Sequence, residues 1–312
     1  MNSNPHISYF RYEDYAQSAN ALFHFMKEEK FLKDILHNRV IIPRYCVENV
    51  EYLEIKKQDI NFDKIAVLQK CFCDIPFHKL GDVFPLIGTG ENFKKLTIPE
   101  KRDLEKNNTH FDYYGKFGIA FSKRWGEQHN LQPIHYLNEE SHYVKEFSEL
   151  ISSALLEDDL PEQYVQDVVN RLSFIKPLRG IMARMIKRKR KNDTEVNIYK
   201  NFHDECEWRY VPESALLKSL GMEAVIANPK MVELHKEISK QLETEKYSSL
   251  WMDFKYDDIR YIIVPDIQTR INIIQEILKI PVDKFDLDKD VDLQKYILIS
   301  KILVLDEIRR DW

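Results

Sequence analysis

The sequence has little cysteine and little glycine for its 312 residues. Four cysteines are too few for the disulfide framework of a secreted domain, so we expect a reducing, cytoplasmic location. With only eight glycines, the chain contains no phosphate-binding loop, dinucleotide fingerprint or nucleophile elbow. These absences exclude the common glycine-dependent nucleotide sites.

A long apolar run and an excess of positive charge are also missing. The best candidate for a membrane segment, YILISKILVL, is interrupted by Lys301 and falls short of the roughly 20 residues that span a bilayer, so we expect no membrane contact. Lys and Arg number 46 against 51 Asp and Glu, a formal net charge of −5. This charge argues against a protein that coats DNA, although it allows a local basic groove. The 44% hydrophobic and 31% charged residues indicate a globular chain.

Strand and helix patterns are interspersed without a regular alternation. Apolar and aromatic runs predict strands at residues 21–26 and 65–77, and helical spacing predicts helices between residues 143 and 174. Residues 81–108 carry turn residues and charges and predict mostly loop, whereas the tail from residue 291 predicts one amphipathic helix. An α+β fold with a mixed or mainly antiparallel sheet follows from this order.

The sharpest local feature is the segment ECEWRY at residues 205–210. We predict a strand, so that Glu205, Glu207 and Arg209 project from one face and the residues between them face the core. Two carboxylates about 7 Å apart on one face can perturb one another's pKa or orient a substrate that carries hydroxyl groups. The alternative is a solvated strand face on which Arg209 links the two glutamates.

Two histidines admit both structural and functional interpretations. His24 lies in the apolar run LFHF, where it is either a hydrogen-bonded histidine of the sheet or a partner for a ribose hydroxyl. His203 precedes Glu205 and Glu207, a weak pattern for a metal site, and we expect no metal.

A basic run occupies residues 184–191, RMIKRKRK, with six basic residues in eight. Such a run is either a solvated loop or an attractor of phosphates. The candidate nucleic-acid contacts are Lys187, Arg188, Lys189, Arg190 and Lys191.

Several segments, taken in order, resemble the AbiGi family of bacterial phage-resistance proteins. They are LFHFM, IIPRYCVEN, CFCDIPF, YGKFGIAFSKRW with PIHYL, and ECEWRYV, and they cover roughly residues 20–215. The family carries an antitoxin label from abortive-infection pairs. The resemblance therefore implies phage defence and a cognate partner protein.

The order of the segments is also similar, more distantly, to that of ADP-ribosyltransferases of the DarT-like kind, which modify nucleic acid. This resemblance implies a single domain over residues 1–280 with a split mixed or antiparallel sheet, flanking helices and an NAD pocket, followed by a helical extension at 281–312. It implies Glu207 and Glu205 as catalytic residues, and it assigns NAD binding to His24, Tyr114, Ser122 and Arg44. The family's usual Ser-Thr-Ser run is missing, so the residue beside nicotinamide stays open between Tyr114 and Ser122.

The resemblances together imply a phage-defence toxin that transfers ADP-ribose from NAD, its substrate, to nucleic acid (RNA or DNA) or protein. Cleavage of the glycosidic bond passes through an oxocarbenium-like state, which Glu207 would stabilise while Glu205 orients the acceptor. The alternative is a non-catalytic antitoxin that keeps the fold and binds a partner. A weaker alternative is a metal-dependent nuclease that uses His203 with the two glutamates.

Overall fold

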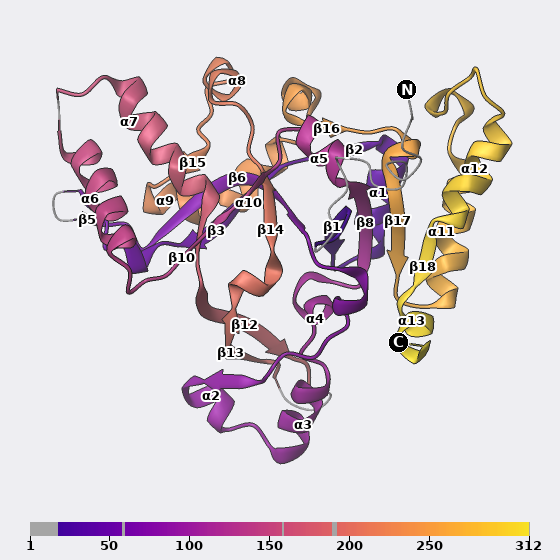
Figure 1. Ribbon diagram of the computed structural model, residues 1–312, viewed down its shortest axis with the longest axis horizontal. Helices are drawn as coiled ribbons and strands as arrows, with labels where there is room; N and C mark the ends of the chain where they lie inside the picture. Colours follow the sequence, from indigo (N-terminus) through magenta and orange to yellow (C-terminus); the bar gives the residue numbers. More distant parts are fainter. Residues whose placement is uncertain (1–17, 58–59, 158, 189–191, 312) are drawn as a thin grey trace, which may run out of the picture.

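A nine-stranded mixed sheet forms the centre of the computed structural model, which describes residues 18–57, 60–157, 159–188 and 192–311 (Figure 1). Its strands follow the order β18–β17–β8–β1–β6–β14–β9, and β3 and β15 also pair with β6. β17 and β18 run parallel, whereas the other pairs of this sheet are antiparallel. The predicted α+β class with a mixed sheet is confirmed. The strands are β1 (Ala21–Met26), β3 (Arg44–Asn49), β6 (Lys64–Cys73), β8 (Phe117–Ser122), β9 (Gln132–Pro133), β14 (Glu207–Tyr210), β15 (Val225–Ile226), β17 (Ile259–Val264) and β18 (Ile302–Val304).

Smaller sheets and helices surround this centre. The antiparallel sheet β12–β13–β7 joins Arg179–Ile186, Thr194–Asn201 and Ile87–Thr89. The two-stranded pairs are β10 (His135–Leu137) with β11 (Ile175–Pro177), β16 (Met252–Asp253) with β2 (Val40–Ile41), and β4 (Lys56–Lys57) with β5 (Ile60–Asn61). The helices are α1 (Glu29–Asn38), α2 (Gly90–Lys94), α3 (Ile98–Lys106), α4 (His110–Tyr114), α5 (Lys123–Gln128), α6 (His142–Leu156), α7 (Glu162–Val169), α8 (Ser214–Ser219), α9 (Pro229–Glu233), α10 (His235–Gln241), α11 (Ile267–Lys279), α12 (Val291–Ser300) and α13 (Leu305–Asp311). Within the described ranges, no helix has the length and apolar character needed to cross a membrane.

The central sheet is divided between β1 and β6. β1 pairs with β8 along its whole length, whereas it meets β6 at one position, where Phe23 lies opposite Cys73. β6 in turn pairs with β14 over Lys70–Cys73. The two halves therefore separate beyond this single meeting point, and each presents an edge to the gap.

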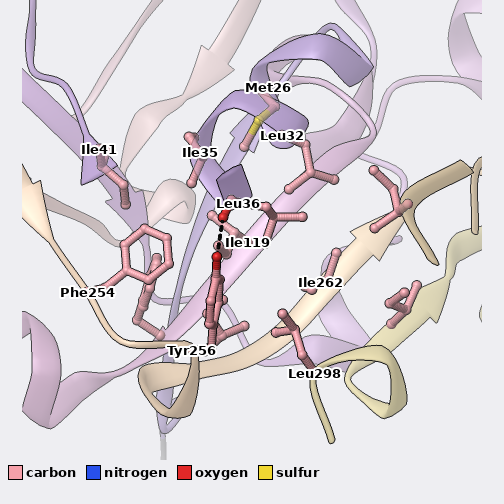
Figure 2. Packing of buried hydrophobic residues seen from close by; sticks show 14 of the residues in the cluster. Met26, Leu32, Ile35, Leu36, Ile41, Ile119, Phe254, Tyr256, Ile262 and Leu298 are labelled. Atoms are coloured by element: carbon pink, nitrogen blue, oxygen red, sulfur yellow. Dashed lines mark hydrogen bonds between the residues drawn. The ribbon is translucent and has the colours of Figure 1, made fainter. Parts of the chain in front are cut away.

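Two large hydrophobic cores cover the sheet. The first packs α1, α11 and α12 against β8, β17 and β18, and the second packs α6, α7, α9 and α10 against β3, β6 and β15. The first also includes Phe72 of β6 and Trp208 of β14, so it extends across both halves. Leu32, Ile35 and Leu36 recur at helical spacing in α1 and are buried in the first core, as amphipathicity predicts. Figure 2 shows this core, with the Tyr256 hydroxyl donating to the Leu36 carbonyl at 2.8 Å.

The prediction of one helix for the tail is wrong. α12 ends at Ser300, and Ile302–Val304 then form β18, which runs parallel to β17. Leu298 of α12 is fully buried in the first core, beside the sheet (Figure 2). Ile302 and Val304 are buried and Leu303 between them is less so, which is the two-residue period of a strand. The apolar residues of α12 directly before them hide this change from a helical to a strand period in the sequence. The division of the chain at residue 280 stays a prediction.

The prediction of a loop over residues 81–108 is also wrong. α3 begins with a capping box, in which the Thr97 hydroxyl accepts from the Glu100 amide and the Glu100 carboxylate accepts from the Thr97 amide. Figure 1 shows α2 and α3 below the main sheet, beside β12 and β13. Leu96 and Leu104 pack there against Val196 and Ile198, so this small unit has a core of its own.

Candidate functional site

A cavity of about 910 Å³ lies at the gap between the two half-sheets. β1 contributes Phe23, His24 and Phe25 to its wall, and β6 contributes residues 69–73. α4, β11 and the beginning of β12 close it from other sides. This volume lies at the upper end of the range of roughly 300–1,000 Å³ for small-molecule sites.

Glu205 and Glu207 face one another across a shared lysine. The Lys176 ammonium lies 2.6 Å from Glu205 Oε2 and 3.1 Å from Glu207 Oε2. Both carboxylates line the cavity, and the two residues are only 4% and 6% exposed. Both carboxylates thus lie in one cavity wall rather than on a solvated strand face, and their catalytic roles stay predictions.

The predicted reason for their proximity needs correction. β14 begins at Glu207, whereas Glu205 ends the 3-10 turn Phe202–Glu205. Cys206 between them is left-handed, with φ of 44°, and is exposed rather than buried in the core. The turn and the left-handed Cys206 together direct Glu205 toward Lys176, so the two carboxylates are not brought together by alternation along one strand.

Neighbouring cations keep both carboxylates ionised. Burial raises the pKa of Glu205, but the attraction of Lys176 and Lys200 outweighs burial and lowers this pKa to about 2. Burial likewise raises the pKa of Glu207, yet Arg209 and Lys176 hold it well below its usual range. The Lys200 ammonium lies 2.8 Å from Glu205 Oε1, and Arg209 Nε lies 2.6 Å from Glu207 Oε1. The cavity floor is thus an extended network of ionised groups.

Arg209 continues this network toward β3. Its side chain is fully buried, and its second terminal nitrogen lies 2.8 Å from a Glu48 carboxylate oxygen. Its first terminal nitrogen donates to the Ser173 carbonyl at 2.9 Å. One guanidinium therefore connects Glu207, Glu48 and the backbone before β11.

Tyr114 reaches the same network from α4. Its hydroxyl donates to Glu205 Oε1 and accepts from Lys200 Nζ at 3.1 Å. Gly115 follows with φ of 112°, and a Cβ there would overlap the Met26 carbonyl. Only glycine allows α4 to end this close to β1 and so hold Tyr114 over the cavity.

His24 bridges the gap between the half-sheets. Its Nδ1 lies 3.0 Å from the Cys71 carbonyl, which can only accept, so Nδ1 carries the proton. Burial, and then the charge of Lys70, lowers the pKa of His24 well below its ordinary value, so the ring is neutral. Nε2 then remains as a hydrogen-bond acceptor in the cavity wall.

Comparisons with known proteins agree on one relationship. A family model described as "Putative abortive phage resistance protein AbiGi, antitoxin" matches residues 102–265. The "Abortive phage resistance protein AbiGi" of Lactococcus lactis subsp. cremoris is 35% identical over 283 residues, which cover 87% of this chain and 99% of the relative. The chain belongs to the AbiGi family. No solved structure matches it.

Other predicted site residues of this AbiGi protein lie in different places. Arg44 lines the cavity, although its guanidinium contacts Glu243 at 2.6 Å. Ser122 does not belong to the residues lining the cavity; its hydroxyl caps α5 by accepting from the Trp125 amide at 3.2 Å.

The basic run begins within β12, which contains Arg184 and ends at Ile186. Lys187 is exposed just after this strand, and Arg188 pairs with Glu100 at 2.6 Å. Lys189, Arg190 and Lys191 lie outside the described residues. Contact of this run with nucleic acid stays a prediction.

Sequence reasoning missed the cations that organise the site. Lys200 follows Val196 and Ile198 at a period of two and occupies a buried position on the same strand face. A lysine at a core position of an alternating strand indicates a buried ion pair, and this signal was available in the sequence. Lys176, between Ile175 and Pro177, carries a similar but weaker signal.

Acid should weaken the fold through Glu205. Its folded-state pKa of about 2 lies below the ordinary value of 4.5, so its stabilising effect is complete above that value and is lost as the pH falls toward 2. We expect the urea midpoint to fall across this window, and to fall less in Glu205→Gln, which has no carboxylate to protonate. Equal pH dependence of the two proteins would contradict the assignment.

Proposed function

We propose that this AbiGi protein is a phage-defence toxin that binds NAD in the cavity, cleaves the bond between nicotinamide and ribose, and transfers ADP-ribose to an acceptor. One observation carries the proposal: His24, Tyr114 and the neighbouring pair Glu205 and Glu207, from three separate segments, line a single cavity at the gap of a split sheet. The resemblance to ADP-ribosyltransferases implies such a grouping.

An aromatic part of the cavity wall suits the nicotinamide ring. The His110 ring lies 4.5 Å from that of Tyr114 and 5.3 Å from that of Phe25, measured between centroids. Among the described residues His110 Nδ1 is buried without a hydrogen-bond partner, and burial lowers the pKa of His110 to about 3. A neutral ring with an unused nitrogen offers both a stacking surface and a hydrogen bond to a carboxamide.

The ribose would lie between His24 and Glu207. A neutral His24, whose Nε2 can accept a hydrogen bond, suits a ribose hydroxyl that donates. Glu207 accepts hydrogen bonds from Lys176 and Arg209, and a carboxylate can accept further bonds. Because Glu207 is ionised, it would stabilise the positive charge that develops on the ribose during cleavage.

Nucleic acid is the favoured acceptor class. Arg179 is exposed and lines the cavity at the beginning of β12, and Lys187 is exposed beyond the end of the same strand. These two cations, one in the cavity wall and one past the far end of β12, would attract the phosphate backbone of a nucleic acid. Glu205 would orient the acceptor group or take its proton.

Binding of NAD should raise the thermal stability of the protein. At 100 times its dissociation constant, a ligand that binds only the folded state stabilises it by about 2.7 kcal/mol. We expect a rise in melting temperature with millimolar NAD, a smaller rise in Tyr114→Phe, and an undiminished rise in the control Ser122→Ala, whose hydroxyl lies outside the cavity wall. An unchanged melting temperature in properly folded protein would contradict NAD binding.

A second candidate function is that of a non-catalytic antitoxin. Two observations favour it: the family description includes the word antitoxin, and each carboxylate already contacts two cations. On this alternative the ion-pair network holds the fold and a surface binds the cognate partner. Expression of the chain alone separates the two, because a toxin slows growth and an antitoxin does not.

A further inference from the structure

The cavity has a second polar end that the proposed chemistry does not use. Tyr52, Gln69 and Glu48 all belong to its wall. Gln69 is 1% exposed on β6, and Tyr52 lies in the 3-10 turn Glu51–Leu53. Gln69 Nε2 donates to Glu48 at 2.8 Å, and the charge of Glu48 acts on the Tyr52 phenol. These three residues, called here the Tyr52 end, therefore form one polar group.

Two polar atoms at the Tyr52 end have no partner within the part of the chain that the structure describes. They are Gln69 Oε1 and the Tyr52 hydroxyl, both buried. The bond from Nε2 to Glu48 fixes the orientation of the amide, so Oε1 presents an acceptor. Burial, followed by Glu48, raises the pKa of Tyr52, so the phenol stays protonated and can donate. Because buried polar atoms are nearly always hydrogen-bonded, two such atoms in one cavity wall indicate where a ligand would bind.

We infer that the Tyr52 end binds the base of an adenine nucleotide. Adenine presents the N6 amino group as a donor with a ring nitrogen beside it as an acceptor. The amino group matches Gln69 Oε1, and the ring nitrogen matches the Tyr52 hydroxyl. The inference rests on the proposed function in treating the occupant as a nucleotide, and it names the base that the cavity selects.

The charges around the cavity support this orientation. Glu48, Glu51 and Glu139 all line the wall, and carboxylates favour an amino group over a phosphate or a keto oxygen. Lys70 and the exposed Arg179, which also line the wall, are cations that can attract the phosphates. The base rather than the phosphates thus fits the Tyr52 end.

Replacement of the adenine amino group by a keto group tests the inference. Hypoxanthine places an acceptor opposite Gln69 Oε1, and buried polar groups left unpaired discriminate strongly. We expect calorimetry to give AMP at least about 30-fold tighter binding than IMP. NAD and its hypoxanthine analogue, measured in the same way, should show the same preference.

Tyr52→Phe provides the matching variant. Its hydroxyl has no protein partner among the described residues, so the change should leave folding intact, weaken AMP about 10-fold and reduce the preference over IMP. The control is Tyr210→Phe, because the Tyr210 hydroxyl bonds the Leu250 carbonyl and this residue does not line the cavity. It should keep the preference.

The outcomes separate the inference from the proposed function. If the protein prefers adenine but does not cleave NAD, the result supports the inference about adenine and contradicts the proposed enzymatic activity. NAD binding or cleavage with no preference over the hypoxanthine analogue overturns the inference alone. Equal affinity for AMP and IMP together with equal affinity for NAD and its hypoxanthine analogue overturns the inference, and so does a lack of binding of all four. An unchanged preference for AMP over IMP in Tyr52→Phe also overturns it.

Discussion

Replacement of Glu207 by glutamine should lower the rate of NAD cleavage by about 100- to 1,000-fold. The carboxylate would stabilise charge that exists only in the transition state, and a neutral amide cannot replace that interaction. The measurement is release of nicotinamide by the purified protein, with circular dichroism and thermal melting to show that the variant is folded. Near-normal cleavage by Glu207→Gln would show that Glu207 has no catalytic role.

Glu205→Gln is the matched comparison, because the two carboxylates share Lys176 and are similarly buried. We expect this variant to lose transfer to an acceptor more than slow hydrolysis, since water needs less orientation than a base or side chain. If the chain is a toxin, Glu207→Gln should also restore growth on expression. Equal losses of hydrolysis and transfer in both variants would indicate that the network as a whole, rather than separate roles, had been damaged.

Replacement of Arg209 by methionine should cost about 3–5 kcal/mol of unfolding free energy. The guanidinium is fully buried between Glu207 and Glu48, at 2.6 and 2.8 Å, and its loss leaves both carboxylates without this partner. Breaking a buried ion pair from one side is costly because the remaining charges stay desolvated. Urea unfolding at neutral pH measures the effect.

Arg270→Met is the control for this result. Arg270 also contacts a glutamate, Glu307 at 2.8 Å, but the two side chains are 35% and 45% exposed. A pair exposed to water contributes about 0–1 kcal/mol, so this variant should remain close to the parent. A loss at Arg209 as small as that at Arg270 would mean that water reaches the cavity floor and screens its charges.

Much of the strand framework was predictable because its apolar runs are compact. The runs at residues 21–26 and 65–77 have few interpretations other than buried strands, and β1 and β6 lie there. The sequence could not indicate that these strands meet at one pair of residues, because pairing depends on the register of strands far apart in the chain. The gap that contains the cavity is therefore a tertiary property.

The candidate site divides in a similar way. Glu205 and Glu207 were identified from their spacing, yet the structural reason, a left-handed Cys206 after a 3-10 turn, has no clear signal in a segment that alternates like a strand. Tyr52 and Gln69 lie 17 residues apart and look ordinary in the sequence. Their unpartnered atoms become visible only when every neighbour is known.

The strand order also has a consequence for synthesis of the chain on the ribosome. β3, β6, β9, β14 and β15, which make up the half-sheet of Glu207, all lie between residues 44 and 226, whereas the half of β1 needs β17 and β18 from residues 259–304. Pairing β8 with β17 requires closing the long stretch of chain between them, which is slow. Translation at about 5–20 residues per second also delivers β17 and β18 seconds after β1. The half-sheet that carries His24 is thus completed last. A nascent chain would therefore lack the complete split sheet around the cavity until β17 and β18 have emerged from the ribosome.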